Sequence, residues 1–471
     1  MRKTKIVCTL GPSCDSGHIL REMIRAGMNI ARLNMAHGEL DEHRERIRKV
    51  REAAENEQAY VPVLMDIKGP EVRIGKLKED FVELVSGADI ILTTEQILGD
   101  STKIPVNYEE MPKVVKPNSR ILIDDGLIEL KVKSTSDHEI LCSVVNGGKL
   151  KPRKGVNLPG VHTTLPGVTE RDVKHVLFGI ENGIEIIAMS FVRKAEDILE
   201  LREILKENHG EHIQIISKIE NDEGVANLDA IIEASDGIMV ARGDLGVEIP
   251  VEEVPLVQKE IVEKCNAAGK PVIVATHMLD SMQVNPRPTR AEVSDVSAAV
   301  LQGADLVMLS GESAAGKYPV ESVRMMATIA EKAESVMDYT EQFNKRQAQH
   351  GPSITEVISQ AAVRSTFELD AKAILTPTES GFTARMVSKY RPKAPIIAIT
   401  QHPEVIRKLC LLWGVIPVLG EPVASTDEML DSAMKNSLAT GIVRQGDYVV
   451  MSAGVPIGRA GTTNLIRIEQ V

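Results

Sequence analysis

Two short segments of this 471-residue chain place charged side chains directly after apolar, strand-forming residues. The first segment carries Lys218 and Glu220, and the second carries Arg242 and Asp244. A buried strand that ends in such residues delivers their charges to one edge of a sheet. Two carboxylates and two cations at one edge suit a divalent metal ion that holds an anionic, oxygen-rich substrate. Surface salt bridges would explain one such strand end, but the pattern recurs along the chain.

The elements that would position these charges are apolar strands that alternate with helix-length stretches. Eight strands are predicted, over Lys5–Leu10, Met28–Leu33, Val61–Met65, Ile184–Ala188, Ile213–Ile216, Gly237–Val240, Pro271–Ala275 and Asp305–Leu309. This alternation predicts a parallel sheet, and eight units predict a (β/α)8 TIM barrel with its active site at the C-terminal strand ends. Seven of the eight ends carry polar groups: Arg32 with Asn34, Asp66 with Lys68, Ser190, Lys218 with Glu220, Arg242 with Asp244, Thr276, and Ser310 with Glu312.

Two further regions interrupt or follow the barrel. Residues 70–166 replace one helix by short alternating strands separated by turns, which predicts an inserted small β-barrel domain. Because this insertion leaves and re-enters at the predicted rim, we expect it to act as a lid. After a polar linker near Asn344–Pro352, renewed alternation predicts a doubly wound α/β domain over residues 346–471. The catalytic barrel is therefore expected over residues 1–69 and 167–345.

The composition argues against several classes of protein. The balance of 67 acidic against 55 basic residues gives a net charge of −12, which disfavours nucleic acid or an anionic membrane as a partner. The sequence shows no apolar stretch long enough to span a bilayer and no signal peptide. The five cysteines are scattered without metal-ligand spacing, which indicates reduced thiols and a cytoplasmic location.

One loop of the C-terminal region has the composition of a phosphate-binding loop. The loop runs over Thr378–Thr383, between a predicted strand and a predicted helix. Hydroxyls and amides at the start of a helix are well suited to bind phosphate. The residues that would supply them are Thr378, Ser380, Gly381 and Thr383. Loops of this composition also serve simply as helix caps, so the signal is weak when taken alone.

Eight blocks of the sequence, in order along the chain, resemble the pyruvate kinase family. They include Ile213–Val225 (IQIISKIENDEGV), Asp66–Arg73 (DIKGPEVR), Lys154–Gly160 (KGVNLPG) and Met308–Ser313 (MLSGES). The resemblance covers essentially the whole chain and is closest to the bacterial type that has no extra C-terminal phosphoenolpyruvate-utilising-type domain. It implies a cytoplasmic phosphotransferase that moves the phosphoryl group of phosphoenolpyruvate to ADP, giving ATP and pyruvate in the last step of glycolysis.

The resemblance also implies roles for individual residues. Glu220 and Asp244 would hold Mg²⁺ or Mn²⁺, and Lys218 would stabilise charge on the transferred group. Arg32 would contact phosphoryl oxygens, and Thr276 would deliver a proton to the enolate through a relay, because a threonine hydroxyl is a weak acid. The substrate-binding set also contains Ala241, Arg242 and Gly243, whose amides would bind the substrate carboxylate. The nucleotide-binding set is Asn34, His37, Arg73 and Lys154.

One departure from the family concerns K⁺. The resemblance implies a K⁺ site formed by Asn34, Asp66 and the backbone carbonyl of Ile67. The family usually has serine at position 36, whereas Ala36 offers no side-chain oxygen to a cation that selects oxygen ligands. Glu71, the residue that accompanies K⁺ dependence in the family, is present. We therefore expect activation by K⁺ that needs more of the ion than is usual for the family.

The resemblance further implies regulation and assembly. A phosphorylated allosteric effector is expected at the Thr378–Thr383 loop, with Trp413 as part of its pocket. Glu379 would repel a bisphosphate, so we expect a monophosphate such as AMP or ribose 5-phosphate rather than fructose 1,6-bisphosphate. The chain is also expected to form a homotetramer with closed two-fold symmetry.

Two other functions remain open at this stage. Another Mg²⁺-dependent barrel enzyme that acts on an enolate, of the aldolase or lyase type, would share the lysine and the carboxylates. It would not explain the inserted domain or the block over Asp66–Arg73. A catalytically weak sensor of sugar phosphates would use the C-terminal domain, but it would not need Lys218, Glu220, Asp244 and Thr276.

Overall fold

The computed structural model describes residues 1–348, 353–458 and 461–471, and the eight predicted strands close into a parallel barrel in it. The strands are β1 (Lys5–Thr9), β2 (Ile30–Asn34), β3 (Val63–Ile67), β12 (Ile186–Met189), β13 (Gln214–Ile219), β14 (Gly237–Ala241), β15 (Val272–Ala275) and β16 (Leu306–Leu309). Their order around the ring is β1-β16-β15-β14-β13-β12-β3-β2, so neighbours in sequence are neighbours in space. The predicted (β/α)8 barrel is therefore confirmed.

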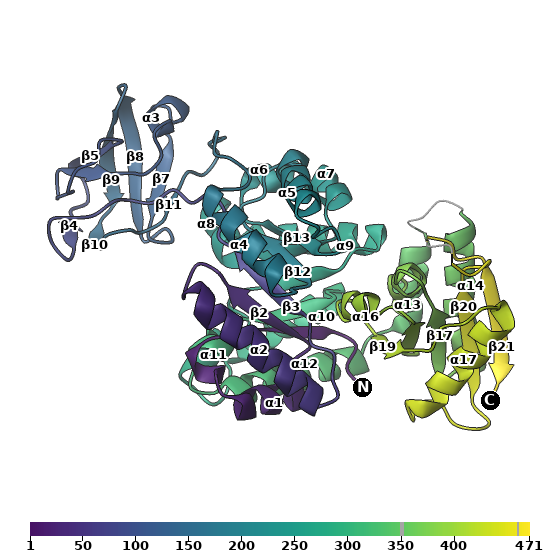
Figure 1. Cartoon of the computed structure of the whole chain (residues 1–471). Coiled ribbons are helices and arrows are strands. Elements are labelled where there is room, and N and C mark those ends of the chain that lie inside the picture. The colour runs from purple at the N-terminus through teal and green to yellow at the C-terminus, as the bar shows by residue number, and fades with distance from the viewer. Residues whose placement is uncertain (349–352, 459–460) are drawn as a thin grey trace.

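Helices surround the barrel strands (Figure 1). They are α1 (Gly17–Ala26), α2 (Leu40–Asn56), α4 (Glu170–Glu181), α5 (Ala195–Glu207), α6 (Asp222–Ala226), α7 (Leu228–Ala234), α8 (Arg242–Glu248), α9 (Val254–Ala268), α10 (Arg290–Gln302), α11 (Gly311–Ala314) and α12 (Pro319–Ser335), with short 3₁₀ turns η1 (Pro12–Cys14) and η2 (Asp280–Gln283). Helix α10 shows why they begin where they do. Thr289 accepts the backbone amide of Glu292, whose carboxylate accepts the amide of Thr289 in return.

The barrel interior is filled by aliphatic side chains from alternate strand positions, such as Leu64, Ile216 and Met239. Leu411, far along the chain, belongs to the same buried cluster. Lys5, at the start of β1, donates a hydrogen bond to the carbonyl of Val415. The C-terminal domain therefore packs on the base of the barrel, and the strand ends that carry the polar groups lie at the other end.

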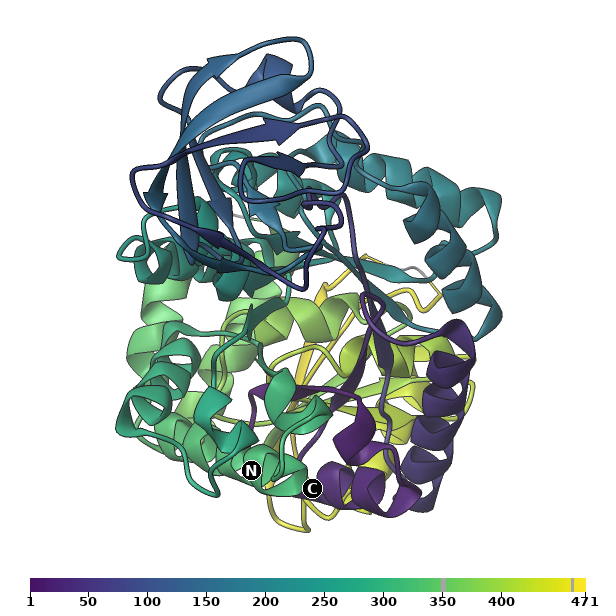
Figure 2. The ribbon, with the colours of Figure 1, turned by 90° about the vertical axis from the view of Figure 1, so that its left-hand side faces the viewer.

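The inserted domain occupies that other end (Figures 1 and 2). It consists of β4 (Val82–Leu84), β5 (Asp89–Thr93), β6 (Lys103–Pro105), α3 (Met111–Val114), β7 (Arg120–Ile123), β8 (Ile128–Thr135), β9 (Glu139–Asn146), β10 (Gly148–Leu150) and β11 (Val156–Asn157). A six-stranded sheet, β11-β7-β8-β9-β5-β6, and the pair β10-β4 enclose a hydrophobic core of their own. Among these named strands, β5 and β6 pair in parallel and the other pairs are antiparallel. Strands β6, β10 and β11 are too short to show the alternation that predicts strands.

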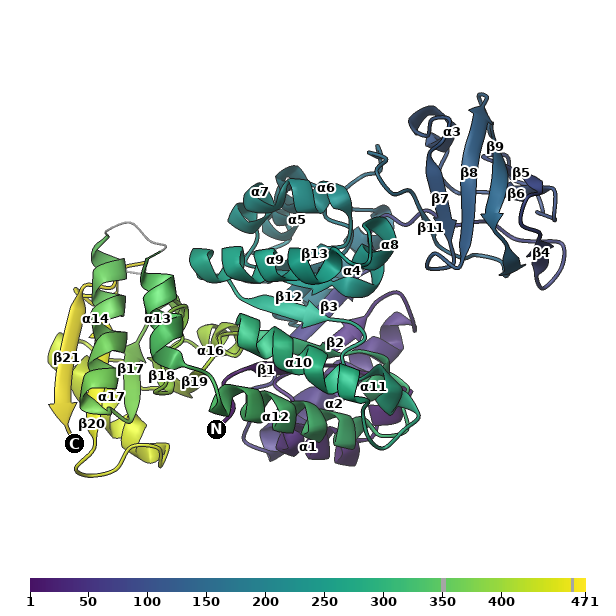
Figure 3. The same cartoon turned by 180° about the vertical axis from the view of Figure 1, so that it is seen from behind.

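The C-terminal domain lies at the opposite end of the barrel (Figure 3). Its elements are α13 (Tyr339–Gln347), α14 (Ile354–Leu369), β17 (Ala373–Pro377), α15 (Phe382–Ser388), β18 (Ile396–Thr400), α16 (Pro403–Leu409), β19 (Val415–Leu419), α17 (Thr426–Ala439), β20 (Tyr448–Ala453) and β21 (Leu465–Gln470). The sheet order is β19-β18-β17-β20-β21, parallel except for the last pair. This confirms the α/β domain predicted from the sequence.

The expected linker near Asn344–Pro352 is wrong in its first part. Helix α13 runs through Gln347, while residues 349–352 lie outside the described residues. The helix forms because Asp338 caps its start and Phe343 is buried in the core of the C-terminal domain. We therefore propose that the C-terminal unit begins before α13 rather than at residue 346.

In the part of the chain that the structure describes, no helix has the length and apolar composition needed to cross a membrane.

Candidate active site at the barrel rim

A buried carboxylate, that of Asp66, is the centre of the charged cluster at the rim. Asp66 is the penultimate residue of β3 and pairs with Asn34 at the end of β2, and one of its oxygens accepts from Arg32 Nε at 2.8 Å. Its other oxygen lies 3.2 Å from Lys218 Nζ and accepts the Ser190 hydroxyl at 3.2 Å. The barrel thus brings together Arg32, Asp66, Ser190 and Lys218 from four strand ends, as the sequence predicted.

The charges of this cluster stabilise one another. Burial alone would lower the pKa of Lys218, but the carboxylates of Asp66 and Glu220 outweigh it and raise that pKa above its usual value. Burial would raise the pKa of Asp66, but Lys218 and Arg32 outweigh it and lower that pKa. Lys218 is therefore held as a cation, and Asp66 as an anion, in a site from which water is largely excluded.

Glu220 follows β13 and is fully buried. One oxygen accepts the backbone amide of Phe191 at 2.6 Å, and that residue adopts a left-handed conformation with φ of 55°. The other oxygen lies 3.0 Å from Lys218 Nζ but has no well-oriented hydrogen bond among the described residues. Burial raises the pKa of Glu220 to about 8, and the nearby Asp244 carboxylate pushes in the same direction. A cation between the two carboxylates would offset both the cost of burying the Glu220 charge and its repulsion by Asp244.

These two carboxylates fit a divalent ion that takes its other ligands from substrate and water. Hard cations such as Mg²⁺ prefer carboxylate oxygens and commonly use only one or two from the protein. The buried, under-bonded oxygen of Glu220 is a ligand of this kind. The described residues contain no group of three histidine, cysteine or acidic side chains arranged for a metal, so an all-protein cage is not what this rim offers.

The loop after β15 is fixed by Arg242. Thr276 and His277 both have left-handed backbones, with φ of 65° and 54°. The guanidinium of Arg242 donates to the carbonyls of Ala275 (3.1 Å) and Thr276 (2.6 Å). Thr276 Oγ1 accepts the amide of Gly243 at 2.8 Å. The side chain of Arg242 therefore holds the Thr276 loop in place, and α8 begins beside it.

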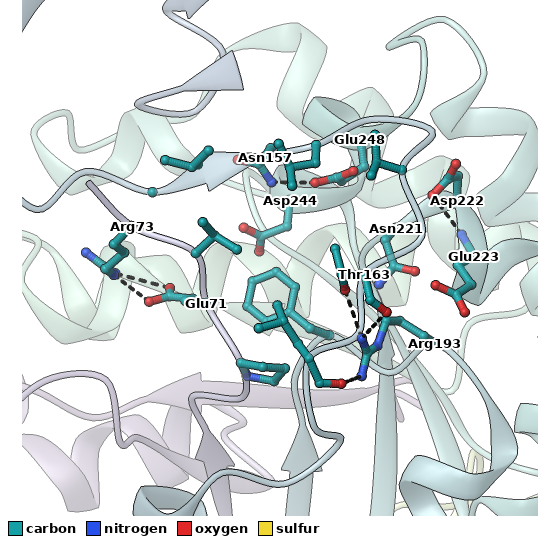
Figure 4. A pocket seen from close by; sticks show the side chains of 18 of the residues that line it. Glu71, Arg73, Asn157, Thr163, Arg193, Asn221, Asp222, Glu223, Asp244 and Glu248 are labelled. Atoms are coloured by element: carbon teal, nitrogen blue, oxygen red, sulfur yellow. Dashed lines mark hydrogen bonds and ion pairs between the residues drawn. The ribbon is translucent and has the colours of Figure 1, made fainter. Parts of the chain in front are cut away.

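A pocket lies between the inserted domain and the barrel rim (Figure 4). Asp244 and Glu248 line it from the barrel side, and Arg73 and Lys154 line it from the inserted domain. The side-chain amide of Asn157, on β11, donates to the carboxylate of Glu248 at 2.7 Å at the pocket. This space is concave and charged, as an active site between two domains should be.

The expected nucleotide-binding residues divide into two pairs. Arg73 and Lys154 lie on neighbouring segments, because Arg73 forms an isolated β-bridge with Gly155, and both line the pocket. Arg73 forms an ion pair with Glu71 at 2.5 Å. Asn34 is the last residue of β2 and His37 is exposed on the loop that follows, and neither is among the residues that line the pocket. The structure therefore does not bring the two pairs into one pocket.

Comparison with known proteins identifies the family. Residues 1–323 match the model for the pyruvate kinase barrel domain, and residues 356–469 match that for the pyruvate kinase alpha/beta domain. The chain belongs to the pyruvate kinase family. It is 53% identical to pyruvate kinase of Bacillus licheniformis over 100% of this chain and 81% of the relative. It is 48% identical to that of Clostridium acetobutylicum over 100% of both. The crystal structure of a pyruvate kinase from Cryptosporidium parvum has a TM-score of 0.95 at 40% identity, covering 100% of this chain and 96% of that one.

The residues expected to bind K⁺ offer few oxygen atoms that are not already hydrogen-bonded. Asn34 Oδ1 already accepts the backbone amide of Ala36 at 3.1 Å. Both oxygens of Asp66 have hydrogen-bonded partners, and Ile67 is buried at the end of β3. Ala36 adds no side-chain oxygen, so the neighbourhood is poorer in ligands than a serine there would make it.

The Thr378–Thr383 loop borders a pocket in the C-terminal domain. Thr378, Ser380 and Thr383 line this pocket, and Gly381 is the left-handed residue before α15, with φ of 83°. The Gly381 amide donates to Thr378 Oγ1 at 2.9 Å, so the loop partly caps itself. Glu379 and Glu421 also line the pocket, and no lysine or arginine does so among the described residues.

The expectation that Trp413 belongs to this pocket is wrong. Trp413 is 1% exposed and lies beneath Lys3, whose ammonium is 5.6 Å from the ring centroid. It also stacks against the guanidinium of Arg391 at 5.0 Å. These contacts place the indole where the C-terminal domain meets the barrel, because a large apolar ring is stabilised most by full burial.

Sequence reasoning missed three groups at the rim. Thr9 ends β1, the one barrel strand for which no polar end group was predicted, and its hydroxyl accepts from Arg32 at 2.8 Å, so a polar residue at the end of that strand was the available signal. The amide of Phe191 gives no side-chain signal, because it acts through the backbone. Arg193 lines the pocket and binds the inserted domain, and only its place just after a barrel strand could have pointed to it.

Proposed function

We propose that this pyruvate kinase transfers the phosphoryl group of phosphoenolpyruvate to ADP at the barrel rim, with Lys218 as its central cation. The observation that carries this assignment is a buried ammonium held between Asp66 and Glu220. Phosphoryl transfer needs positioning and neutralisation of charge on the transferred oxygens rather than covalent chemistry by the protein. A preorganised cation in a dry site supplies that neutralisation without reorganisation.

Glu220 and Asp244 are the residues that we assign to Mg²⁺ or Mn²⁺. When bound there, the ion supplies positive charge that binds substrate oxygens and lowers the cost of the charge that develops on them. Glu220 is held for this role by the Phe191 amide on one oxygen. Asp66 is not free for it, because both its oxygens accept hydrogen bonds.

Arg32 is assigned to phosphoryl transfer and Thr276 to protonation of the enolate. Arg32 is oriented by Asp66 and Thr9, and its planar guanidinium suits phosphoryl oxygens. Thr276 is assigned to proton delivery at the enolate through a relay, because its hydroxyl is held between the Ala275 carbonyl and the Gly243 amide. The amides of Ala241, Arg242 and Gly243 are assigned to the substrate carboxylate.

The inserted domain is proposed to close over both substrates. Arg73 and Lys154 would then reach the nucleotide phosphates, and Asn34 and His37 would contact the nucleotide from the barrel side. K⁺ is proposed to bind near Asn34, Asp66 and the Ile67 carbonyl, with weakened affinity because of Ala36. The acidic lining of the C-terminal pocket supports a monophosphate effector rather than a bisphosphate. Assembly as a homotetramer and a cytoplasmic location complete the proposal.

A coupled assay tests the reaction directly. Pyruvate formed from phosphoenolpyruvate is followed with Mg²⁺ and K⁺, with and without ADP, while ATP is measured in parallel. We expect equal amounts of pyruvate and ATP, and none of either without ADP. Pyruvate formed without ADP would indicate a hydrolytic or lyase-type enzyme instead, and binding of a sugar phosphate without turnover would indicate a sensor.

A further inference from the structure

The loop after β12, residues 190–194, contacts both the charged cluster and the inserted domain. Its first residue, Ser190, accepts a hydrogen bond from Lys218 Nζ at 2.7 Å. Its second residue, Phe191, donates its amide to Glu220 at 2.6 Å. The orientation of both proposed active-site groups therefore depends on where this short loop lies.

Through Arg193, the same loop forms hydrogen bonds with the C-terminal end of the inserted domain. The guanidinium is buried, and Nη1 donates to the carbonyl and the hydroxyl of Thr163 at 3.2 and 2.9 Å. Nη2 donates to the carbonyl of Leu165 at 2.5 Å. Figure 4 shows Arg193 pointing toward Thr163 at the edge of the pocket. Three bonds from one planar group fix the direction of a segment as well as its distance.

The segment that Arg193 grips is itself attached to the inserted domain. Leu165 packs against that domain's hydrophobic core. The amide of Thr164 donates to the Tyr108 hydroxyl at 3.0 Å, and the two hydroxyls lie 2.9 Å apart. A shift of the inserted domain must therefore either carry Arg193 with it or break these contacts.

The residue just before the inserted domain, Gly69, contacts the same loop. Gly69 has a left-handed backbone with φ of 70°, and a Cβ placed there would lie 2.8 Å from the carbonyl oxygen of Ser190. The backbones of residues 69 and 190 are thus in direct contact. Both chain crossings of the inserted domain consequently meet at residues 190–193.

We propose that Arg193 is a positioning residue that couples the placement of the inserted domain to the geometry of Lys218 and Glu220. This inference rests on the roles proposed above for those two residues. Closure of the inserted domain would move the Thr163–Leu165 segment, and Arg193 would transmit that movement to Ser190 and Phe191. The site would thus be fully assembled only when the domain is in place.

The test combines rates with a distance measurement on the full-length enzyme. Val145 on the inserted domain and Leu199 on α5 are exposed and are replaced by cysteine for spin labels. All five native cysteines are buried, so the labels go to the introduced sites. The variants are Arg193→Gln, Arg193→Lys and Thr163→Val. The matched control is Arg202→Gln, because Arg202 also binds a carbonyl and a carboxylate, those of Ala234 and Asp236, away from the inserted domain.

We expect Arg193→Gln to broaden the distance distribution and to lower kcat by about 10- to 100-fold, with a smaller change in KM for phosphoenolpyruvate. Arg193→Lys should recover part of both effects, and Thr163→Val should show a weaker version of both. Arg202→Gln should change neither. Thr163→Val removes one acceptor only, so it keeps the test decisive if the arginine variants fold poorly.

A change in kcat without a change in the distance distribution, or the reverse, would overturn the proposal. A lower kcat with an unchanged distance distribution would mean that Arg193 acts on the site directly. A broadened distribution with an unchanged kcat would mean that the inserted domain is not coupled to the site. Failure of the proposed function itself would look different. The wild-type enzyme would then not form pyruvate and ATP in equal amounts, or Lys218→Ala would keep near-normal turnover, whatever the distance distribution.

Discussion

The barrel rim and the pocket of the C-terminal domain differ in where their charges lie. At the rim, Lys218 and Glu220 are buried and contact one another, and Asp66 joins them to Arg32. In the C-terminal pocket, hydroxyls and amides surround the space, and the half-exposed Glu379 pairs with His402 at 2.7 Å. Buried charge is costly unless it is paired, and it is preorganised once it is paired.

This difference separates chemistry from reversible binding. Charge that develops during phosphoryl transfer needs fixed, desolvated opposite charge, which the rim provides. A regulatory pocket needs only a modest difference in affinity between two conformations, which neutral donors supply. Substitutions at the rim should therefore change turnover, whereas substitutions in the C-terminal pocket should change only its regulation.

The largest expected effect follows removal of the central cation. Lys218→Ala should lower kcat by about 10²- to 10³-fold, because the charge on the transferred group would lose its preorganised partner. Steady-state rates at saturating substrates and Mg²⁺ measure this. Lys206→Ala, on the exposed side of α5, is the matched control and should be near normal. Near-normal turnover in Lys218→Ala would remove the basis of the contrast.

Loss of a metal ligand should appear first as a demand for more metal. Glu220→Gln should raise the Mg²⁺ concentration for half-maximal activity by about 10- to 100-fold, because a carboxylate ligand is replaced by a neutral amide. Activity titrations with Mg²⁺ at fixed substrates measure this. Glu252→Gln, at an exposed carboxylate in the turn between α8 and α9, serves as control. An unchanged Mg²⁺ titration would place the ion elsewhere.

The C-terminal pocket should behave in the opposite way. Ser380→Asp adds a negative charge to a pocket that already holds Glu379 and Glu421, so it should abolish activation by AMP or ribose 5-phosphate. In the wild type, the effector should raise the apparent affinity for phosphoenolpyruvate by about 5- to 150-fold, and the variant should lose this increase. Its kcat at saturating phosphoenolpyruvate should stay the same. Activation that survives would put the effector elsewhere, and activation by fructose 1,6-bisphosphate alone would contradict the role given to Glu379.

A smaller effect should follow restoration of the missing K⁺ ligand. Ala36→Ser should lower the K⁺ concentration for half-maximal activity by roughly 2- to 10-fold, the effect of about one neutral hydrogen-bonding group. Titrations of activity with KCl at constant ionic strength measure it. Full activity without K⁺ or Na⁺ would contradict the K⁺ site, and an unchanged titration in Ala36→Ser would contradict the role of position 36.

The last expected effect concerns stability rather than activity, and it depends on pH at the pocket edge. Burial raises the pKa of Glu248 to about 7 from its ordinary value of 4.5. The folded state then holds a proton that the unfolded chain has lost, so stability falls as the pH rises between these values. Glu248→Gln should therefore stabilise the protein at pH 8, by up to about 3 kcal/mol, and leave it unchanged at pH 4. Thermal unfolding at both pH values measures this, and an equal shift at both would contradict it.

The sequence predicted most of the rim because its elements are regular. Apolar strands of alternating units give the barrel, and seven of the eight strand ends identify rim residues such as Lys218 or Asp66. What escaped prediction acts through backbone or through long-range contact. The Phe191 amide depends on a left-handed φ, and the grip of Arg193 on Thr163 joins residues thirty positions apart. Neither is encoded in local spacing.

The C-terminal pocket was predicted less well for a related reason. Its loop could be found from Thr378 and Ser380, but which other elements line the pocket depends on how the domain packs. Trp413 was assigned to the pocket and instead fills the junction with the barrel, beside Lys3. Helix α13 continued through polar residues because Phe343 anchors it in a core that local composition does not reveal.

Anomalous diffraction from crystals of this enzyme soaked with Mn²⁺ and phosphoenolpyruvate tests the central claim most directly. We predict one strong manganese peak beside the carboxylates of Glu220 and Asp244, which would hold the ion, with Lys218 Nζ in contact with the substrate phosphoryl group. A manganese peak elsewhere, with the two carboxylates bound only to protein or water in the presence of substrate, would contradict the account.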